Sequence, residues 1–402
     1  MTQEILVVGF GAVGAIYAYS LHRTDKVRLT VVARGNYELI KEHGMYIKSQ
    51  RFGNVEAWKP HRVVNSISSA ADRQYSHVIL STKCVPEVIK TPDLLKPLIS
   101  SPYCDQFQQP VYVLLQNGLN IEVDLYRAIK ALGKPEEPVI INTGVYVFAN
   151  LISANVVEHG PFARLDIGIY RPHDYTTMVN SPAEQQVLEG LKELFHNVDI
   201  NIYPEIQRKK FAKNMLNIAY AACACLTRCS LTSLFRPPPT NVPYEPYLDP
   251  VTADRVNLYT RKWIKDILDE CVRLGRAMGF PDSEDGLPSS IVENSMKTSE
   301  KNYSGPDSNH NPSTLLDIEK GAPIEVEVIW GETVRLAKER NVDVPRIEMA
   351  STLRNKLRIE LHDIALFQFH SLSQSPAAIT FPSPRPLSSP IIIQSGTGTP
   401  DQ

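Results

Sequence analysis

Three glycines recur at fixed spacing near the start of the sequence, in Gly9-Phe10-Gly11-Ala12-Val13-Gly14. In this pattern the first glycine permits a tight turn, the second lets backbone approach a pyrophosphate, and the third lets a helix pack closely on a strand. The apolar run Ile5–Val8 precedes the motif and a helix-like segment, Gly14–Leu21, follows it, so free N–H groups at a helix start face the phosphates. A glycine-rich turn without a ligand is the alternative. We predict that all six residues contact a dinucleotide cofactor.

The kind of dinucleotide is indicated twenty residues after Gly14, where Arg34 follows the apolar run Val27–Ala33. Enzymes that use NAD usually place Asp or Glu there, to bind the ribose 2′-hydroxyl. A cation instead favours the 2′-phosphate of NADP. We expect Lys83, just beyond the strand-like run Tyr75–Ser81, at the same sheet edge as a second charge. A solvated surface arginine is the alternative for Arg34, and NADPH is the predicted cofactor.

A stripe of lysine and asparagine predicts a second polar site on a helix that begins after Pro204. At 100° per residue, the members of this stripe fall within a wedge of about 100°: Lys210, Lys213, Asn214, Asn217 and Ala221. The other faces are apolar, with Phe211, Met215, Leu216, Ala219 and Tyr220. Such a stripe on a buried helix is costly unless something polar faces it. A cleft for an anionic oxo acid is one interpretation, and a solvent-facing stripe is the other.

The loop Leu114–Asn120 is a third candidate, because it follows the carboxyl end of a predicted strand, where doubly wound sheets bind ligands. Asn117 offers both a donor and an acceptor to a nicotinamide amide, a ribose or a substrate oxygen. Asn-Gly is also a common turn dipeptide, which is the alternative.

The elements that position these residues follow an α/β pattern. Short apolar runs alternate with helix-like segments over the first 200 residues, which predicts a mostly parallel, Rossmann-type doubly wound sheet. The later strands are expected at Val111–Leu115, Val139–Ile141, Ala163–Ile169 and Val198–Tyr203. Helices are expected at Ile206–Leu234, Thr252–Met278, Ile324–Arg340 and Glu348–Leu361. We predict an NADP-binding domain over 1–205 and an all-α substrate domain over 206–370, with a proline-rich insertion at 236–250 and a disordered Ser/Pro-rich tail at 371–402.

Charge and composition exclude several classes of protein. The net charge of -2 provides no basic field for nucleic acid or for an anionic membrane, and no apolar stretch is long enough to span one. A strand that starts at residue 4 leaves no room for a targeting peptide, so we expect a cytoplasmic protein. The cysteines lack paired ligand spacings, so Cys223, Cys225 and Cys229 are interpreted as buried helix residues and no metal site is expected. A homodimer is left open.

Several separated segments resemble the ketopantoate reductase (2-dehydropantoate 2-reductase) family. They are Ile5–Gly35, Ser81–Lys83, Gln116–Gly118 and Asn311–Gly331, in the family's order, and they cover most of residues 3–350. Family members also carry an aromatic residue, one residue, a lysine and asparagines four and eight residues later. Phe211, Lys213 and Asn217 fit this spacing, with Leu226-Thr227 beyond.

The resemblance implies a role for each matching residue. Lys213 would be the general acid that protonates a carbonyl oxygen as hydride reaches carbon. Asn217 would contact the substrate. Ser313 would bind the carboxylate of the substrate. Glu325 would lie near the nicotinamide ribose, Asn117 would contact both cofactor and substrate, and Val145 would contact the cofactor through its backbone. A shifted register with Lys210 and Asn214, a helix cap at Ser313 and an exposed carboxylate at Glu325 remain alternatives.

Two departures from the family pattern lie at the substrate end. Ala221 replaces the second asparagine, and Leu231 stands where the family has a polar contact. Losing two hydrogen-bonding positions is expected to weaken recognition of the family substrate or to indicate a different one. Because the cofactor and lysine motifs are present, we predict an NADPH-dependent reductase of a small 2-oxo acid, ketopantoate first. A tailoring reductase for another carbonyl compound and a non-catalytic Rossmann scaffold are the alternatives.

Overall fold

A ten-stranded sheet carries the glycine motif in the computed structural model, which describes residues 2–235, 250–305 and 311–353. The strands run in the order β4-β3-β9-β8-β7-β6-β1-β2-β5, and β10 pairs with β9. Their bounds are β1 (Gln3–Val8), β2 (Val27–Val32), β3 (Met45–Ser49), β4 (Gly53–Trp58), β5 (Arg62–Val64), β6 (His77–Leu80), β7 (Val111–Leu114), β8 (Ile140–Ser153), β9 (Val156–Ile169) and β10 (Asp199–Ile202). Only the β8–β9 and β3–β4 pairs among these are antiparallel, so the predicted mostly parallel sheet is confirmed.

Helices cover both faces of the sheet. In the first half these are α1 (Ala12–His22), α2 (Tyr37–His43), α3 (Thr91–Leu94), α4 (Tyr103–Gln106), α5 (Val123–Lys130) and α6 (Pro182–Lys192), with short 3-10 turns at Ser68–Ala70 and Lys96–Leu98. Along β1 the side chains alternate: Leu6 and Val8 belong to one core, whereas Ile5 and Val7 belong to the other. This period of two, with both faces apolar, is typical of a sheet buried on both sides.

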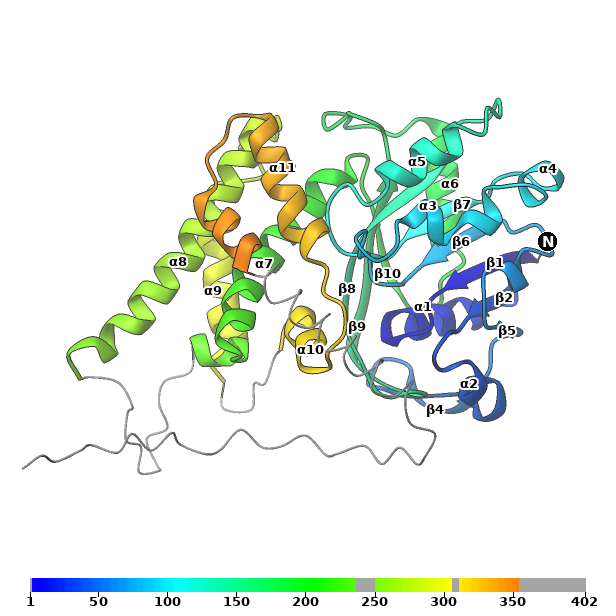
Figure 1. The fold of residues 1–402 in the computed structure, drawn as a ribbon, viewed down its shortest axis with the longest axis horizontal. Helices are drawn as coiled ribbons and strands as arrows, with labels where there is room; N and C mark the ends of the chain where they lie inside the picture. The colour runs from blue at the N-terminus through cyan, green and yellow to red at the C-terminus, as the bar shows by residue number, and fades with distance from the viewer. Residues whose placement is uncertain (1, 236–249, 306–310, 354–402) are drawn as a thin grey trace, which may run out of the picture. The chain divides into compact units, whose positions relative to one another are not determined.

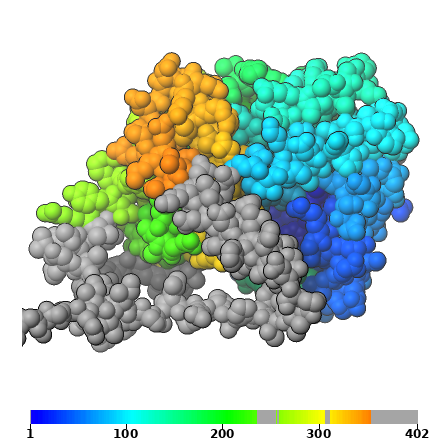
Figure 2. All heavy atoms as spheres, viewed as in Figure 1, coloured from blue at the N-terminus to red at the C-terminus, as the bar shows by residue number. Residues whose placement is uncertain are grey.

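The second half is helical. Its elements are α7 (Ile206–Thr227), a 3-10 turn at Leu231–Leu234, α8 (Pro250–Ala277), α9 (Ile291–Tyr303), α10 (Ser313–Glu319), the π-helical turn η4 (Glu327–Gly331), α11 (Glu332–Glu339) and a helix over 345–353. Helix α7 packs on α8, on α10 and on β8, and α8 packs on α9 (Figure 1). Figure 2 shows the yellow and orange segment from residue 311 onward against the cyan part of the sheet region. The Rossmann-type sheet followed by helices confirms the predicted fold class.

One core runs from the sheet into these helices, since Leu6 and Val8 share it with Phe211 of α7 and Leu268 of α8. The described residues 2–235, 250–305 and 311–353 accordingly belong to one compact unit. The division at residue 205 stays a prediction. So does the insertion predicted at 236–250, of which residues 236–249 lie outside the described residues, and so does the tail at 371–402, which lies wholly outside them. None of the described helices is both long and apolar enough to cross a membrane.

Several predicted element bounds were wrong. Strands β8 and β9 have 14 residues each, far longer than predicted, because they continue as an antiparallel hairpin whose alternation we missed. Strands β3, β4 and β5 were missed altogether. Helix α7 ends at Thr227, because Arg228 takes a left-handed φ of 58° and breaks the helical hydrogen bonding. Ile324 and Glu325 lie before the helical turn rather than inside a helix.

A glycine fixes the loop after β7 against the helical half. Gly118 has a φ of +97°, and a Cβ there would lie 2.5 Å from the Val328 Cβ of η4. The neighbouring Leu119 N–H donates to the Val328 carbonyl over 2.8 Å. This position therefore requires glycine for two reasons, its backbone conformation and the close approach of η4.

We expect Gly118→Ala to lower the free energy of unfolding more than Gly133→Ala does. Gly133 also has a positive φ, of +67°, but a Cβ there would meet nothing within 4 Å. The shared left-handed conformation costs about 1–2 kcal/mol in each variant. Overpacking against Val328 adds about 1–3 kcal/mol in Gly118→Ala alone. Urea unfolding of the two variants measures the difference, and equal losses would contradict the close approach.

Candidate functional site

The carboxyl ends of β1, β2, β6 and β7 meet at one edge of the sheet, because these strands are parallel neighbours. Each strand is followed there by one of the predicted segments. These are Gly9–Gly14 after β1, Arg34 after β2, Ser81–Lys83 after β6 and Gln116–Asn120 after β7. The chain crosses to opposite sides of β1 at this point, and such a switch point is where doubly wound sheets bind ligands.

The glycine motif forms a cradle at the start of α1. Gly9 has a φ of +99°, and a Cβ on Gly14 would lie 2.3 Å from the Gly9 carbonyl oxygen, so both positions exclude larger residues. A Cβ on Gly11 would meet no atom within 4 Å, which leaves space beside the helix start. Helix α1 has Gly11 as its N-cap and no side-chain cap, so its first N–H groups are available. The cradle fits a pyrophosphate.

Two side chains hold this turn in place. Asn36 Nδ2 donates to the Phe10 carbonyl over 3.0 Å, and Ser81 Oγ donates to the Gly9 carbonyl over 2.9 Å. Ala12 and Val13 occupy the first turn of α1 and pack partly against the core.

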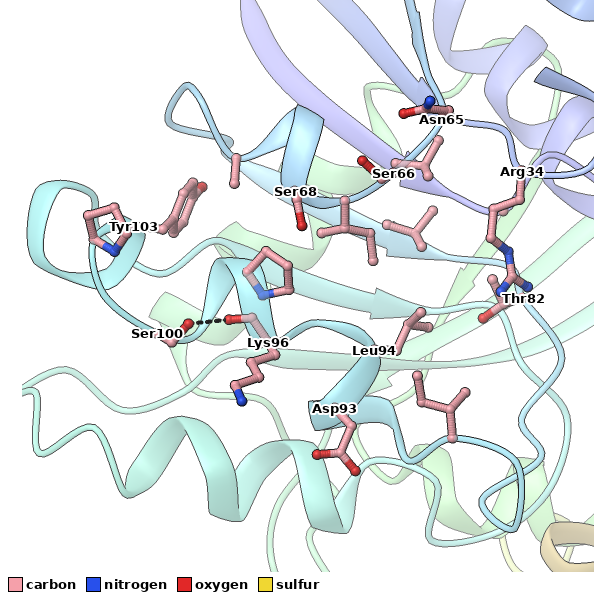
Figure 3. A pocket seen from close by; sticks show the side chains of 18 of the residues that line it. Arg34, Asn65, Ser66, Ser68, Thr82, Asp93, Leu94, Lys96, Ser100 and Tyr103 are labelled. Atoms are coloured by element: carbon pink, nitrogen blue, oxygen red, sulfur yellow. Dashed lines mark hydrogen bonds between the residues drawn. The ribbon is translucent and has the colours of Figure 1, made fainter. Parts of the chain in front are cut away.

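Arg34 lines a pocket of about 680 Å³ beside the glycine turn. Its side chain reaches into the pocket near Thr82 (Figure 3). The rest of the lining is mixed polar and apolar and includes Asn65, Ser66, Ser68 and Lys96. The pocket is large enough for an adenosine group, and Arg34 supplies a cation to it.

Lys83 does not line that pocket. Its ammonium lies 2.6 Å from Asp317 Oδ2 in α10 and 3.6 Å from Glu325 Oε2. Burial alone would lower the pKa of Lys83, but the charges of Glu325 and Asp317 outweigh it and raise this pKa. Glu325 is itself buried, and its Oε1 accepts from the Cys84 backbone N–H over 3.0 Å. Lys83 is thus placed between the sheet and α10, not among the lining residues of the Arg34 pocket.

Lys213 points toward the loop after β7. Its ammonium donates to Asn117 Oδ1 over 2.6 Å and lies 5.8 Å from the centre of the Tyr146 ring. Burial lowers the pKa of Lys213 to about 8. The negative charge of Glu325 raises this pKa in part, and the positive charge of Lys210 lowers it further. Lys213 and Asn117 line a narrow cavity of about 10 Å³, together with Gln116, Gly118, Thr143, Lys210, Asn214 and Asn217. The stripe predicted on this helix therefore faces polar groups of the sheet.

Lys210 and Asn214, the residues of the alternative register, contact groups in the protein interior. Lys210 is buried, with its ammonium 3.1 Å from Asn142 Oδ1 and 3.7 Å from Glu122 Oε2. Asn214 Nδ2 donates to the Ile329 carbonyl over 2.9 Å, which ties α7 to η4. Lys213 is thus the lysine bonded to Asn117, whereas Lys210 is engaged deeper in the interior. Leu216, expected on a buried face, is 37% exposed.

The other predicted substrate and cofactor residues are less closely grouped. Asn217 is half-buried and lines the Lys213 cavity. Ser313 is exposed and begins α10, the helix that packs on α7. Val145 lies in β8 opposite Leu165 and is partly buried. The roles of these residues stay predictions.

Sequence reasoning missed the partners of the charged residues. Glu122, Asn142 and Tyr146 surround the two lysines, and Asp317 pairs with Lys83. Asp317 lies in the late segment that carries the family resemblance, which was the available signal. The others are far from the lysines in sequence, and no local pattern marks them.

Ala221 and Leu231, at the two positions where polar substrate contacts were expected from the family resemblance, are both buried. Of the three clustered cysteines, Cys223 and Cys225 are buried as expected. Cys229 is exposed, against expectation, because α7 ends before it. Within the described parts of the chain, no group of three or more His, Cys, Asp or Glu side chains is placed to hold a metal ion.

Comparisons with known proteins match both halves of the chain. Residues 5–172 match the family described as Ketopantoate reductase PanE/ApbA, and residues 205–357 match Ketopantoate reductase PanE/ApbA C terminal. A Saccharomyces cerevisiae protein described as uncharacterized is 22% identical over 369 residues, which are 87% of this chain and 92% of the yeast protein.

Solved structures share the fold. 2-Dehydropantoate 2-reductase from Methylococcus capsulatus has a TM-score of 0.67 at 22% identity, covering 89% of this chain and 97% of that one. D-mandelate dehydrogenase with NADH and anilino(oxo)acetate has a TM-score of 0.66 at 17% identity, covering 89% of this chain and 99% of that one. At these identities the likeness extends to the fold alone. With its two halves matched in order, the chain belongs to the ketopantoate reductase family, NAD(P)-dependent oxidoreductases that act on CH–OH groups.

Proposed function

We propose that the protein is an NADPH-dependent reductase of a small 2-oxo acid, with 2-dehydropantoate (ketopantoate) as the first candidate substrate. One observation carries the proposal. The Lys213 ammonium lies in a cavity at the carboxyl edge of the sheet, bonded to Asn117 and beside Asn217. A lysine there can hold a proton for a substrate oxygen while the glycine cradle holds the dinucleotide.

The cofactor, when bound, supplies the hydride that reduces the carbonyl carbon. Lys213 donates its proton from Nζ to the carbonyl oxygen, so that C=O becomes CH–OH and the lysine is left as a neutral amine. Asn117 orients the ammonium through its Oδ1 and keeps its amide N–H groups for cofactor or substrate. Asn217 and Ser313 bind the substrate, and Glu325 and Val145 contact the cofactor. Lys83 joins them through its contact with Glu325.

The preference for NADPH rests on Arg34. A guanidinium matches the 2′-phosphate with paired hydrogen bonds, and Arg34 projects into the pocket next to the glycine turn. The cytoplasmic location and a homodimer stay predictions from the sequence.

A different carbonyl substrate is a second candidate, because Ala221 and Leu231 are buried and apolar. Two lost hydrogen-bonding positions weaken selection for a polar substrate. The structural relative D-mandelate dehydrogenase carries its activity on a similar fold. A panel of 2-oxo acids, ketopantoate first, separates the two candidates by kcat/KM.

We expect Lys213→Ala to lower kcat about 10²–10⁴-fold, the usual contribution of a positioned general acid. NADPH affinity should stay nearly unchanged, because the glycine cradle and Arg34 are untouched. Lys209→Ala is the matched control on the same helix, since the Lys209 ammonium lies over the Tyr203 ring instead. Oxidation of NADPH with the substrate panel measures kcat. An unchanged kcat would exclude the assigned role, and tight NADPH binding without turnover of any substrate would favour a non-catalytic protein.

The rate of reduction should fall as pH rises through about 8. Lys213 can donate a proton only while it is protonated, and burial lowers its pKa to about 8. Below that pH Lys213 is protonated, so its titration should cause no change in kcat/KM. Above it, kcat/KM should fall about tenfold per pH unit. A profile that stays level up to pH 10, in an enzyme that still turns over, would contradict a lysine acid with this pKa.

Replacing Arg34 should separate the two cofactors. Arg34→Ala is expected to raise the Kd for NADPH about 10–100-fold, the worth of a charge-assisted hydrogen bond, with little change for NADH. Arg28→Ala is the control, because Arg28 lies in β2, the strand that precedes Arg34, and pairs with Glu4. Fluorescence titration with each cofactor gives the Kd. Equal losses for NADPH and NADH would mean that Arg34 does not read the 2′-phosphate.

A further inference from the structure

A buried ion pair lies beside the candidate general acid. Lys210 and Glu122 are each less than a tenth exposed, and the Lys210 ammonium is 3.7 Å from Glu122 Oε2. Gln207 Nε2 donates to Glu122 Oε1 over 2.8 Å, and Asn142 Oδ1 accepts from Lys210 over 3.1 Å. The Glu122 Oε2 atom has no hydrogen-bond partner among the described residues, so Lys210 is the cation that faces it.

The same elements hold this pair and Lys213. Lys210 and Lys213 are three residues apart on α7, which places them side by side about 60° apart on the helix surface. The loop after β7 carries Asn117 to Lys213, and its continuation carries Glu122 to Lys210. Both lysines line one cavity. Lys210 therefore lies close enough for its charge to act on the Lys213 ammonium, and Glu122 acts through Lys210, whose charge it faces and offsets.

Stability does not account for such a pair. Removing two charges from water costs about as much as their attraction returns, and apolar side chains of similar volume often serve a core better. Two ammonium groups on adjacent helix positions also repel each other. The arrangement has a use, however, if the positive and the negative charge act in opposite senses on a third group.

Resting on the proposed function, we propose that Lys210 and Glu122 are positioning residues that set the proton affinity of Lys213 by opposing charges. Lys210 makes the proton of Lys213 easier to release to the substrate oxygen. Glu122 limits this effect, so that Lys213 still carries a proton near neutral pH. Neither residue contacts the reacting atoms in this role.

Other charged and titratable groups face the two lysines and stay constant in the test. Burial lowers the pKa of Lys210 as it does that of Lys213. The groups around them come from the turn after β6, from β8, from β9 and from the segment before η4: Lys83, Cys84, Tyr146, Asp166 and Glu325. The substitutions change none of these side chains, so a shift of the pH profile reports the pair.

The test is the pH dependence of kcat/KM in full-length variants, with NADPH and the best substrate of the panel. Lys210→Gln leaves Glu122 as an unpaired negative charge, so the falling limb of the kcat/KM profile should shift to higher pH by about one unit. Glu122→Gln leaves an extra positive charge, and the limb should move down by about as much. The double variant should lie between them. Lys210→Arg and Glu122→Asp keep the charges, and their limbs should stay near that of the unsubstituted protein.

A purely structural pair gives a different pattern. In that case all disruptive variants lose thermal stability and kcat, but their limbs coincide, and this result overturns the inference. Limbs that move in the same direction for Lys210→Gln and Glu122→Gln also overturn it. If one single variant does not fold, the double variant, which leaves no unpaired charge, is compared with the other. Their limbs must then differ in the stated order.

Failure of the proposed function looks different again. An unsubstituted protein with no turnover, or a Lys213→Ala variant that keeps both its kcat and its falling limb, removes the general acid itself, and the inference falls with it. The falling limb of the kcat/KM profile can also depend on Lys213 and yet stay in place in the Lys210 and Glu122 variants. That result leaves the proposed function intact and contradicts only the inference about the pair.

Discussion

The hydrogen bond between the Lys213 ammonium and Asn117 joins the helical half of the chain to the sheet, and the rest of the site depends on it. A partly buried ammonium loses part of its hydration and needs a partner in return. Here the partner is a neutral amide oxygen, which does not restore the full stability of the charged form. The proton of Lys213 is therefore held less tightly than in water, as an acid working near neutral pH requires.

The pKa of Lys83 is shifted in the opposite direction. It faces two carboxylates, Asp317 and Glu325, and their charges raise its pKa. Such a lysine stays protonated and serves as a fixed charge that ties the turn after β6 to α10. The two residues are both lysines and differ in their partners, so the pKa of Lys213 is lowered while that of Lys83 is raised.

The sequence predicted those parts of the site that follow a local rule. The glycine motif and Arg34 depend on strand ends and on a fixed spacing, and the lysine–asparagine stripe depends on the helical period. The partners of the charges could not be found in this way. Glu122 meets Lys210 across 88 positions, and Asp317 meets Lys83 across 234. These pairs depend on how the loop after β7 and α10 pack, which no short pattern records. The long β8–β9 hairpin and the end of α7 at Arg228 were missed because tertiary pairing and one left-handed residue decided them.

The two ends of the proposed site are constrained in different ways. The type of reaction can therefore be kept while the substrate changes. At the proposed cofactor end the glycine turn offers mainly backbone groups, and Gly9 and Gly14 have no room for a side chain. Most substitutions there would block the phosphate cradle or strain the turn. At the proposed substrate end the polar groups are side chains of α7 and its surroundings, whereas Ala221 and Leu231 are buried in an apolar core. A chain can therefore keep the cradle and the Lys213–Asn117 contact while its substrate changes, because the two demands rest on different atoms.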